Sequence, residues 1–183
     1  MLENPTLVAA KEIAEGKILG WHHGRSEFGP RALGARSIVA SPSRKGMKSE
    51  INRKIKFREE YRPFAPAILE SEAKKWGVTK QFPYMTIALN PNQDLAKFIS
   101  ETIHADGTAR VQTVPDQGGP LSELLLSLKS IGAFPAVINT SFNLSGEPIV
   151  ETPIDAVRTF YSCGIDTLYI GRLRLSKNPS TKI

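Results

Sequence analysis

The chain has 183 residues, of which 40% are hydrophobic and 23% charged, the balance of an ordinary globular domain with a sizeable core. It carries 24 Lys and Arg against 18 Asp and Glu, a net charge of +6, so nucleic acid stays open as a partner. No apolar run approaches the roughly 20 residues of a membrane helix, the first residues lack a signal-peptide pattern, and a single cysteine, Cys163, excludes an internal disulfide. We therefore expect a cytoplasmic protein with one domain over residues 1–175 and a loose tail over 176–183.

Helical and extended patterns alternate along the first half of the chain. Asn4 and Pro5 are typical of a helix start and Gly16 of a helix end, which predicts a helix over 5–15. Apolar residues four apart predict a second helix over 43–55, with its basic residues on the opposite face. We expect a third helix over 70–76 and strands over 17–21, 36–41 and 64–69.

The second half continues the same alternation. The expected strands cover 84–89, 109–114, 136–139 and 167–170, and the expected helices cover 120–130 and 152–163. Such alternation is typical of an α/β domain with a mixed, twisted sheet, although the order of the strands is not predicted.

The excess positive charge is local. Residues 25–62 contain eleven Lys or Arg and four Glu, a net charge of +7, whereas the whole chain carries +6. Crowded positive charge favours an anionic ligand, and arginines beside glycine turns suit phosphate oxygens. In GRSEFGPRALG (24–34), glycines bracket Arg31 in a rigid turn. The alternative is a structural turn in which Arg31 pairs with Glu27.

The segment NRKIKFREEYRPFAP (52–66) continues the predicted basic helix and then breaks at Pro63. Lys56 and Arg62 have apolar neighbours, which would hold their side chains against the wall of a binding site. We therefore select them as candidate anion ligands. The other basic residues of this region fit a solvated face with weak surface ion pairs; we assign this reading to Arg44, Lys45, Lys54 and Arg58.

Two later motifs add polar side chains near strands. In HADGTARVQTV (104–114), Arg110 and Gln112 lie two residues apart and so on one face of the predicted strand; alternatively, Arg110 pairs with Asp106. In INTSFNLSGEP (138–148), Asn139 and Ser141 cluster where a predicted strand ends, a common ligand position in α/β sheets; the alternative is a capped loop.

Several familiar catalytic signatures are absent from the sequence. It contains no G-x-x-x-x-G-K-[ST] phosphate loop, no G-x-G-x-x-G dinucleotide turn and no nucleophile elbow. Its three histidines, His22, His23 and His104, lack the spacing of metal ligands, so we predict no protein-held metal.

Taken together, these motifs resemble the C-terminal domain of the NodU/CmcH-type O-carbamoyltransferase family. The matching blocks are GRSEFGPRALGARSI, INRKIKFREEYRPFAP, HADGTARVQTV and INTSFNLSGEPIVETP. They occur in the family's order and spacing, and the resemblance covers roughly residues 15–171. The resemblance implies a YrdC/Sua5-like fold, a twisted mixed sheet with flanking helices. It also implies that a Kae1-like N-terminal domain accompanies this part in the family, so that the chain would be an excised domain, a separate subunit or a remnant.

The resemblance further implies a two-step reaction. Carbamoyl phosphate yields carbamate, which reacts with ATP to give carbamoyl adenylate, and the Kae1-like domain transfers the carbamoyl group to a hydroxyl. The nucleotide- and phosphate-binding residues carry over onto Arg31, Lys56, Arg62, Arg110, Asn139 and Ser141, with Lys56 and Arg62 the catalytic candidates. We expect Mg²⁺ to accompany ATP, held mostly by phosphate oxygens and water.

Two other functions stay open from the sequence. The basic segment would also suit an RNA- or DNA-binding module, although its aromatic residues need not form a stacking row. The domain could also retain a nucleotide pocket without completing carbamoyl transfer. The acceptor and the oligomeric state are not predicted.

Overall fold

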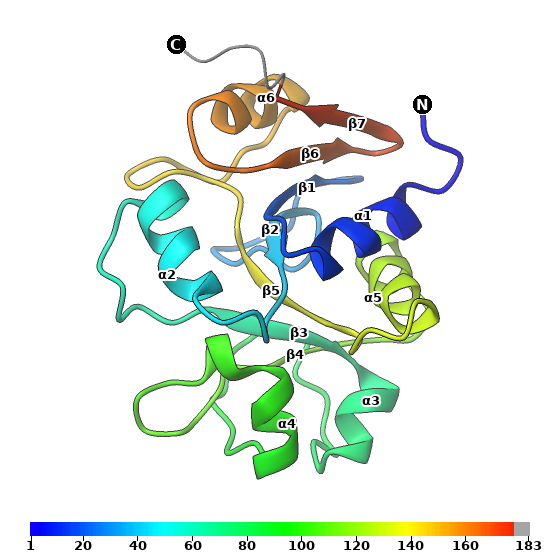
Figure 1. Ribbon diagram of the computed structural model, residues 1–183, viewed down its shortest axis with the longest axis vertical. Coiled ribbons are helices and arrows are strands. Elements are labelled where there is room, and N and C mark those ends of the chain that lie inside the picture. Colours follow the sequence, from blue (N-terminus) through cyan, green and yellow to red (C-terminus); the bar gives the residue numbers. More distant parts are fainter. Residues whose placement is uncertain (178–183) are drawn as a thin grey trace.

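The computed structural model describes residues 1–177 and shows one seven-stranded mixed sheet with helices on both faces (Figure 1). The order of the strands is β4-β3-β5-β2-β1-β6-β7. Only the β1/β6 and β3/β4 pairs are parallel, and the other pairs are antiparallel. This arrangement confirms the predicted α/β class with a mixed sheet. The strands are β1 Leu19–His22, β2 Arg36–Ala40, β3 Ala65–Leu69, β4 Gln112–Val114, β5 Ala136–Ser141, β6 Thr167–Ile170 and β7 Leu173–Ser176.

Six α-helices and two other helical turns flank the sheet. They are α1 Pro5–Ala14, α2 Met47–Ile51 continued by the π-helical turn η1 Asn52–Lys56, α3 Glu70–Lys75, α4 Gln93–Phe98, the 3₁₀ turn η2 Ser100–Thr102, α5 Pro120–Ser130 and α6 Pro153–Tyr161. The Asn4 side chain accepts a hydrogen bond from the backbone N–H of Leu7, which confirms the predicted start of α1. No helix among residues 1–177 is long and apolar enough to cross a membrane.

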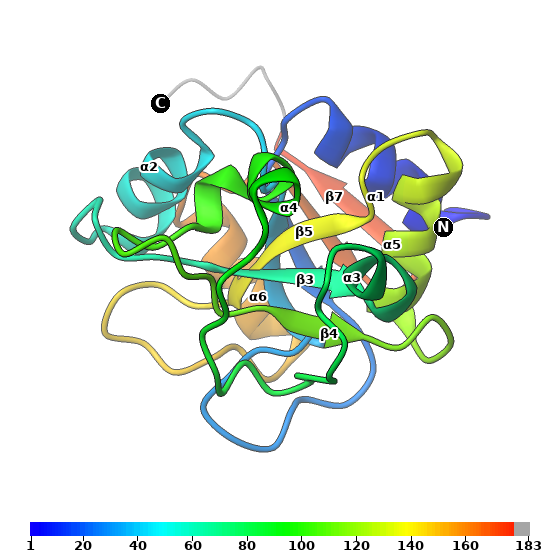
Figure 2. The same cartoon turned by 90° about the horizontal axis from the view of Figure 1, so that it is seen from below.

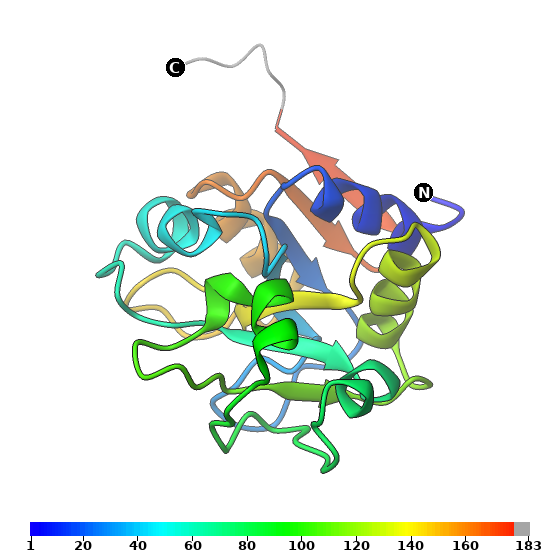
Figure 3. The same ribbon diagram turned by 60° about the horizontal axis from the view of Figure 1, so that its bottom comes forward.

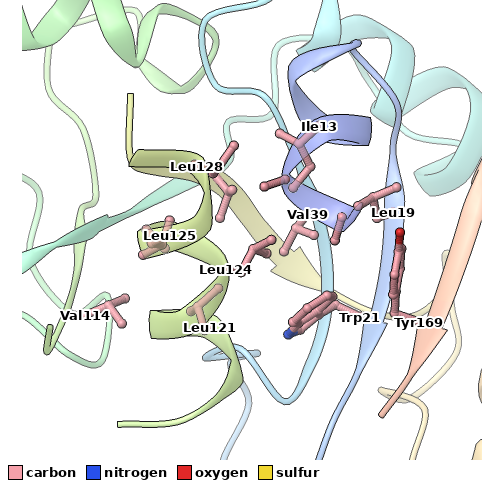
Figure 4. Close-up of a cluster of buried hydrophobic side chains, with 14 of the residues drawn as sticks. Ile13, Leu19, Trp21, Val39, Val114, Leu121, Leu124, Leu125, Leu128 and Tyr169 are labelled. Carbon is pink, nitrogen blue, oxygen red and sulfur yellow. The ribbon is translucent and has the colours of Figure 1, made fainter. Parts of the chain in front are cut away.

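Alternating side chains of the strands divide the core between the two faces. On one face, α1 and α5 lie side by side and bury Trp21 and Tyr169 (Figures 3 and 4). Four leucines along one side of α5 point into this cluster (Figure 4): Leu121, Leu124, Leu125 and Leu128. The opposite face is covered by α2, η1 and α6, and further along by α3 and α4. Strands β1 to β6 are largely buried, whereas β7 is mostly exposed. A one-residue shift of a buried strand would turn each side chain to the opposite face of the sheet, so packing fixes its register.

Four predicted elements differ from the structure. The helix predicted over 43–55 begins only at Met47 and passes into the π-helical turn η1 after Ile51. Residues 84–89 form no strand, because Met85 has a φ of +54°, a left-handed conformation that interrupts extended backbone; Leu89 forms only an isolated bridge with Ala109. The predicted strand over 109–114 shrinks to β4, and the strand over 136–139 extends to Ser141, where it pairs with Ser37 of β2.

One α-helix and one strand were not predicted at all. The helix α4 begins after Asn92, whose side chain accepts from the Leu95 backbone N–H. The strand β7 pairs with β6 and is tied to α1 by Arg174, whose guanidinium binds the buried Glu12 carboxylate. Ser176 therefore belongs to the sheet and not to a tail, and the rest of the predicted tail beyond residue 177 lies outside the described residues.

Candidate functional site

Four of the six predicted site residues line one small cavity at an end of the sheet. Figure 2 shows that the long loop between β1 and β2 and the loop after β5 project on the same side. The cavity has a volume of about 110 Å³ and is lined by Pro30, Arg31, Ala32, Arg58, Pro63, Phe64, Ala65, Met85, Arg110, Asn139, Thr140 and Ser141. Segments that are distant in the sequence therefore contribute residues to one cavity, as the prediction of a shared site requires.

The loop that presents Arg31 is folded around the carboxylate of Glu27. This carboxylate accepts hydrogen bonds from the backbone N–H groups of Leu33 and Ala35, both at 2.7 Å. Glu27 is therefore committed to the backbone of its own loop, and no ion pair of Arg31 occurs among the described residues. The alternative of a turn closed by an Arg31–Glu27 pair is wrong.

A buried arginine that sequence reasoning did not select, Arg36, holds both ends of this loop. Its guanidinium donates to the carbonyl oxygens of His23 at 3.0 Å, Gly24 at 3.1 Å and Glu151 at 3.0 Å. The neighbouring His23 stacks on Trp21, and burial lowers the pKa of His23 to about 4, so this ring is neutral at neutral pH. These contacts make the base of the loop rigid and leave Arg31 at its exposed tip.

Arg110 and Asn139 both line the cavity, and each has one buried polar atom without a partner among the described residues. Asp106 binds the backbone N–H and hydroxyl of Thr108 at 2.9 and 2.8 Å, so the alternative of an Arg110–Asp106 pair is also wrong. Arg110 Nε and Asn139 Oδ1 are both buried and lack a hydrogen-bond partner among the described residues. Burial lowers the pKa of Arg110, and the positive charge of Arg31 lowers it further. A negatively charged ligand that accepts a hydrogen bond from Arg110 would satisfy its unpaired N–H group and offset the repulsion between the two arginines.

The amide of Asn139 is oriented by its other contacts. Its Nδ2 donates to Gln112 Oε1 at 2.7 Å and to the Ala32 carbonyl at 3.3 Å, while Gln112 Nε2 donates to the Leu33 carbonyl at 3.0 Å. This chain of hydrogen bonds connects β5, β4 and the Arg31 loop. It also leaves Asn139 Oδ1 as the available acceptor.

Lys56 lies behind the cavity wall and not in it. Its ammonium group is buried and donates to the Ser141 carbonyl at 2.6 Å and to Asn143 Oδ1 at 2.7 Å, with Ser141 Oγ and the Asn143 carbonyl at 3.2 and 3.1 Å. Burial lowers the pKa of Lys56 to about 7, and the nearby charge of Arg58 acts in the same direction. Lys56 therefore fixes the turn that carries Ser141.

The positions of Arg58 and Arg62 are the reverse of those predicted from the sequence: Arg58 lines the cavity, and Arg62 is exposed. The assignment of Arg58 to a solvated face is wrong: it lines the cavity, its Nε donates to Asn52 Oδ1 at 2.7 Å, and its guanidinium carbon lies 4.8 Å from the centre of the Phe64 ring. Arg62 does not line the cavity; its side chain is 53% exposed and lies 3.8 Å from Glu59. The cause is Phe57, whose φ of +44° ends the π-helical turn and redirects the chain.

The cavity is strongly cationic. Three arginines line it, Arg31, Arg58 and Arg110, and no Asp or Glu is among its lining residues. Among residues 1–177, no group of three or more His, Cys, Asp or Glu could hold a metal ion. Its chemistry is that of an anion-binding site with hydrogen-bonding groups at a strand end.

Comparisons with known proteins match nearly the whole chain. A family model described as the carbamoyltransferase C-terminus matches residues 10–177. The nodulation protein NolO of Bradyrhizobium diazoefficiens is 40% identical over 178 residues, which cover 94% of this chain and 32% of NolO. The 3'-hydroxymethylcephem-O-carbamoyltransferase of Amycolatopsis lactamdurans is 36% identical over 172 residues, which cover 93% of this chain and 32% of that enzyme. The chain thus spans about a third of each of these relatives.

Solved structures share the fold at low sequence identity. P. abyssi Sua5 has a TM-score of 0.58 at 16% identity, covering 95% of this chain and 51% of the Sua5 chain. Full-length HypF in its phosphate- and nucleotide-bound form has a TM-score of 0.54 at 17% identity, covering 88% of this chain and 20% of the HypF chain. These similarities confirm the expected YrdC/Sua5-like fold.

Proposed function

Because the chain belongs to the carbamoyltransferase C-terminus family, we propose that it binds ATP and carbamate and forms carbamoyl adenylate. The observation that carries this proposal is the cavity with three arginines, no carboxylate and two unpaired buried polar atoms. A part of HypF, 20% of its chain, shares the fold, and the phosphate- and nucleotide-bound form of that protein is consistent with a nucleotide ligand here. In this proposal hydrolysis of carbamoyl phosphate supplies the carbamate and releases phosphate.

The proposed reaction needs charge stabilisation more than a protein nucleophile. A carbamate oxygen forms a bond to the α-phosphorus of ATP, and the bond from that phosphorus to the leaving pyrophosphate breaks. Negative charge gathers on the α-phosphoryl oxygens and on pyrophosphate, where fixed cations stabilise the transition state. Arg31, Arg58 and Arg110 would bind these oxygens. Asn139 Oδ1 would accept from the carbamate amino group, since it is the acceptor left open at the strand end.

We assign Lys56 and Arg62 more indirect roles than the sequence suggested. Lys56 would position Ser141, because its ammonium group is occupied by oxygens of Ser141 and Asn143. Arg62 would act as an outer cation on the loop that carries Arg58. Mg²⁺ would arrive with the triphosphate and be held by phosphate oxygens and water, because the cavity wall offers no carboxylate.

Transfer to the final acceptor would need a partner. The chain spans 32% of the length of NolO, and we propose that a Kae1-like domain of the kind implied by the resemblance carries out the second step. The acceptor hydroxyl would then be selected mainly outside this domain.

Calorimetric titration of the whole chain with MgATP and AMP tests the proposal, using Arg110→Ala. Loss of one charged hydrogen-bonding contact, worth roughly 1.5–3 kcal/mol, should weaken ATP binding by about 10- to 150-fold. Arg53→Ala is the matched control, because Arg53 is an exposed arginine of the same basic segment that does not line the cavity. Equal affinities of the two variants, or a wild-type chain that binds neither nucleotide, would refute the proposal.

A further inference from the structure

A separate cavity of about 400 Å³ lies between the end of α3 and the start of α4, two helices on the β3–β4 side of the molecule (Figure 1). Its volume is within the range of small-molecule sites, roughly 300–1,000 Å³. None of its lining residues lines the cationic cavity, so its ligand is a question apart from the proposed function. The lining includes Trp76, Val78, Thr79, Lys80, Phe82 and Leu89.

Two of its apolar lining residues are fixed to neighbouring backbone. The backbone N–H of Phe82 donates to Thr113 Oγ1 at 2.8 Å, and the Thr113 N–H donates back to the Phe82 carbonyl at 3.1 Å. Leu89 and Ala109 exchange two backbone hydrogen bonds, both at 2.8 Å. The cavity is therefore formed before any ligand arrives, which lowers the cost of binding.

Trp76 brings an unpaired hydrogen-bond donor to this cavity. Its ring packs against Phe98 and Phe134, with centroids 5.6 and 6.3 Å away, and its carbonyl accepts from Asn92 Nδ2 at 3.0 Å. The indole Nε1 is nevertheless buried and has no hydrogen-bond partner among the described residues. A ligand atom that accepts from this N–H would remove the cost of leaving it unpaired.

The remaining lining adds one positive charge to apolar walls. Lys80 is exposed, and no ion pair of Lys80 occurs among residues 1–177. No Asp or Glu is among the lining residues, whereas Val78, Phe82 and Leu89 supply apolar surface. A donor and a cation beside an apolar wall complement a ligand with an anionic head and an apolar body.

We propose that this cavity, the Trp76 cavity, binds a small carboxylate with an apolar body. The body packs against Val78, Phe82 and Leu89. The carboxylate accepts a hydrogen bond from Trp76 Nε1 and lies near the Lys80 ammonium group. This site is distinct from the cationic cavity, and both can be occupied at once.

Phenylacetate is the probe, and nuclear magnetic resonance of the isotopically labelled chain is the readout. The chain has two tryptophans, Trp21 and Trp76, and therefore two indole N–H resonances, which Trp76→Phe assigns. Phenylacetate should shift the Trp76 resonance saturably, because this N–H gains an acceptor, and leave that of the fully buried Trp21 unchanged. We expect a Kd on the order of 1 mM, the scale of a small fragment.

Matched ligands and variants test the two parts of the probe. Phenylacetamide keeps the ring without the charge and should bind about two- to fivefold more weakly, the scale of one exposed ion pair. Acetate keeps the charge without the ring and should cause no saturable shift. Lys80→Gln should weaken phenylacetate by the same factor and leave phenylacetamide unchanged. Lys74→Gln is the matched control, because Lys74 is an exposed lysine that does not line the cavity. Thermal melting verifies that each variant folds.

Each failure removes a definite part of the inference. A Trp76 resonance that does not respond to phenylacetate would overturn the site itself. Equal affinities for phenylacetate and phenylacetamide, in both the wild-type chain and Lys80→Gln, would overturn the assignment to carboxylates. Displacement of phenylacetate by MgATP would show that the two cavities are not separate sites. Failure of the chain to bind MgATP would overturn only the proposed function, because phenylacetate binding needs no nucleotide.

Discussion

At the scale of single residues, Lys56 shows how a buried cation can support a site without entering it. All of its hydrogen-bond acceptors are uncharged: two carbonyls, a hydroxyl and an amide oxygen of Ser141 and Asn143. They satisfy the geometry of an ammonium group but do not neutralise its charge. Burial therefore dominates and lowers the pKa of Lys56 from 10.5 to about 7.

This shift predicts a specific pH dependence of stability. Between pH 7 and 10.5 the unfolded chain binds a proton at Lys56 that the folded chain has released, so the free energy of unfolding should rise with pH in this window, by up to about 1.4 kcal/mol per pH unit. Lys56→Met removes the titrating group. Urea denaturation from pH 6 to 10 should show the wild-type chain gaining stability relative to Lys56→Met as pH rises, and parallel profiles would contradict the prediction.

Part of the site could be predicted residue by residue. Four of the predicted residues lie at glycine turns or strand ends, which the local sequence pattern indicates. All four line the cavity: Arg31, Arg110, Asn139 and Ser141. Arg58 could not be found in this way. Its position depends on the left-handed Phe57 after a π-helical turn, and a regular helical spacing assigns it to the wrong face.

At the scale of elements, contact between the Arg31 loop and α5 positions the site. Gly34 has a φ of +119°, and a Cβ atom there would lie 2.6 Å from Leu121 Cδ2 and 2.8 Å from Leu121 Cβ. Because Leu121 belongs to the buried face of α5, it has little room to move. Gly34 therefore permits the close approach that sets the base of the loop against the helix.

Gly34→Ala should accordingly destabilise the chain and weaken ATP binding. Gly29→Ala is the matched control, because Gly29 has a similar φ of +116° but nothing within 4 Å of a new Cβ atom. Both variants carry backbone strain of about 1–2 kcal/mol, whereas only Gly34→Ala adds a steric clash of similar size. Differential scanning calorimetry should show a melting temperature several degrees lower for Gly34→Ala than for Gly29→Ala. Equal melting temperatures would mean that α5 yields to the new methyl group.

The predicted elements divide according to the range of the interactions that form them. Helix α5 has the same bounds as predicted, 120–130, because its apolar spacing and Pro120 are local signals. The strand β7 pairs with its neighbour β6 across a two-residue turn at Gly171 and Arg172, where Gly171 has a φ of +56°. Its Arg174 also binds Glu12 of α1, and a contact between residues 162 positions apart leaves no local pattern. Residues 84–89 have a strand-like composition, but the left-handed Met85 at the cavity wall overrides it.

At the scale of the whole molecule, part of the basic excess outside the cavity is paired with carboxylates. Arg44 and Lys54 both bind Glu50, at 2.5 and 2.7 Å, and Arg62 lies near Glu59. Other cations among residues 1–177, such as Lys45, Lys48 and Arg53, also have no carboxylate partner. A small anion is favoured over a long nucleic acid chain because three arginines converge on one small cavity that no carboxylate lines.

If the proposed function holds, this domain, which spans a third of its relatives' length, should carry out the proposed adenylation step without an acceptor. With MgATP and carbamoyl phosphate, the chain should catalyse exchange of labelled pyrophosphate into ATP, because adenylation requires only the groups that the cavity supplies. Arg110→Ala should lower the exchange rate by about two to three orders of magnitude, the usual effect of removing a donor that stabilises transition-state charge, whereas Arg53→Ala should retain it.

If ATP binds but no exchange occurs, the anion site is a nucleotide-binding site whose chemistry requires the remaining part of the longer proteins. The arginines would then position ATP for groups that the partner domain contributes, and adding that domain should restore exchange in the wild-type chain but not in Arg110→Ala.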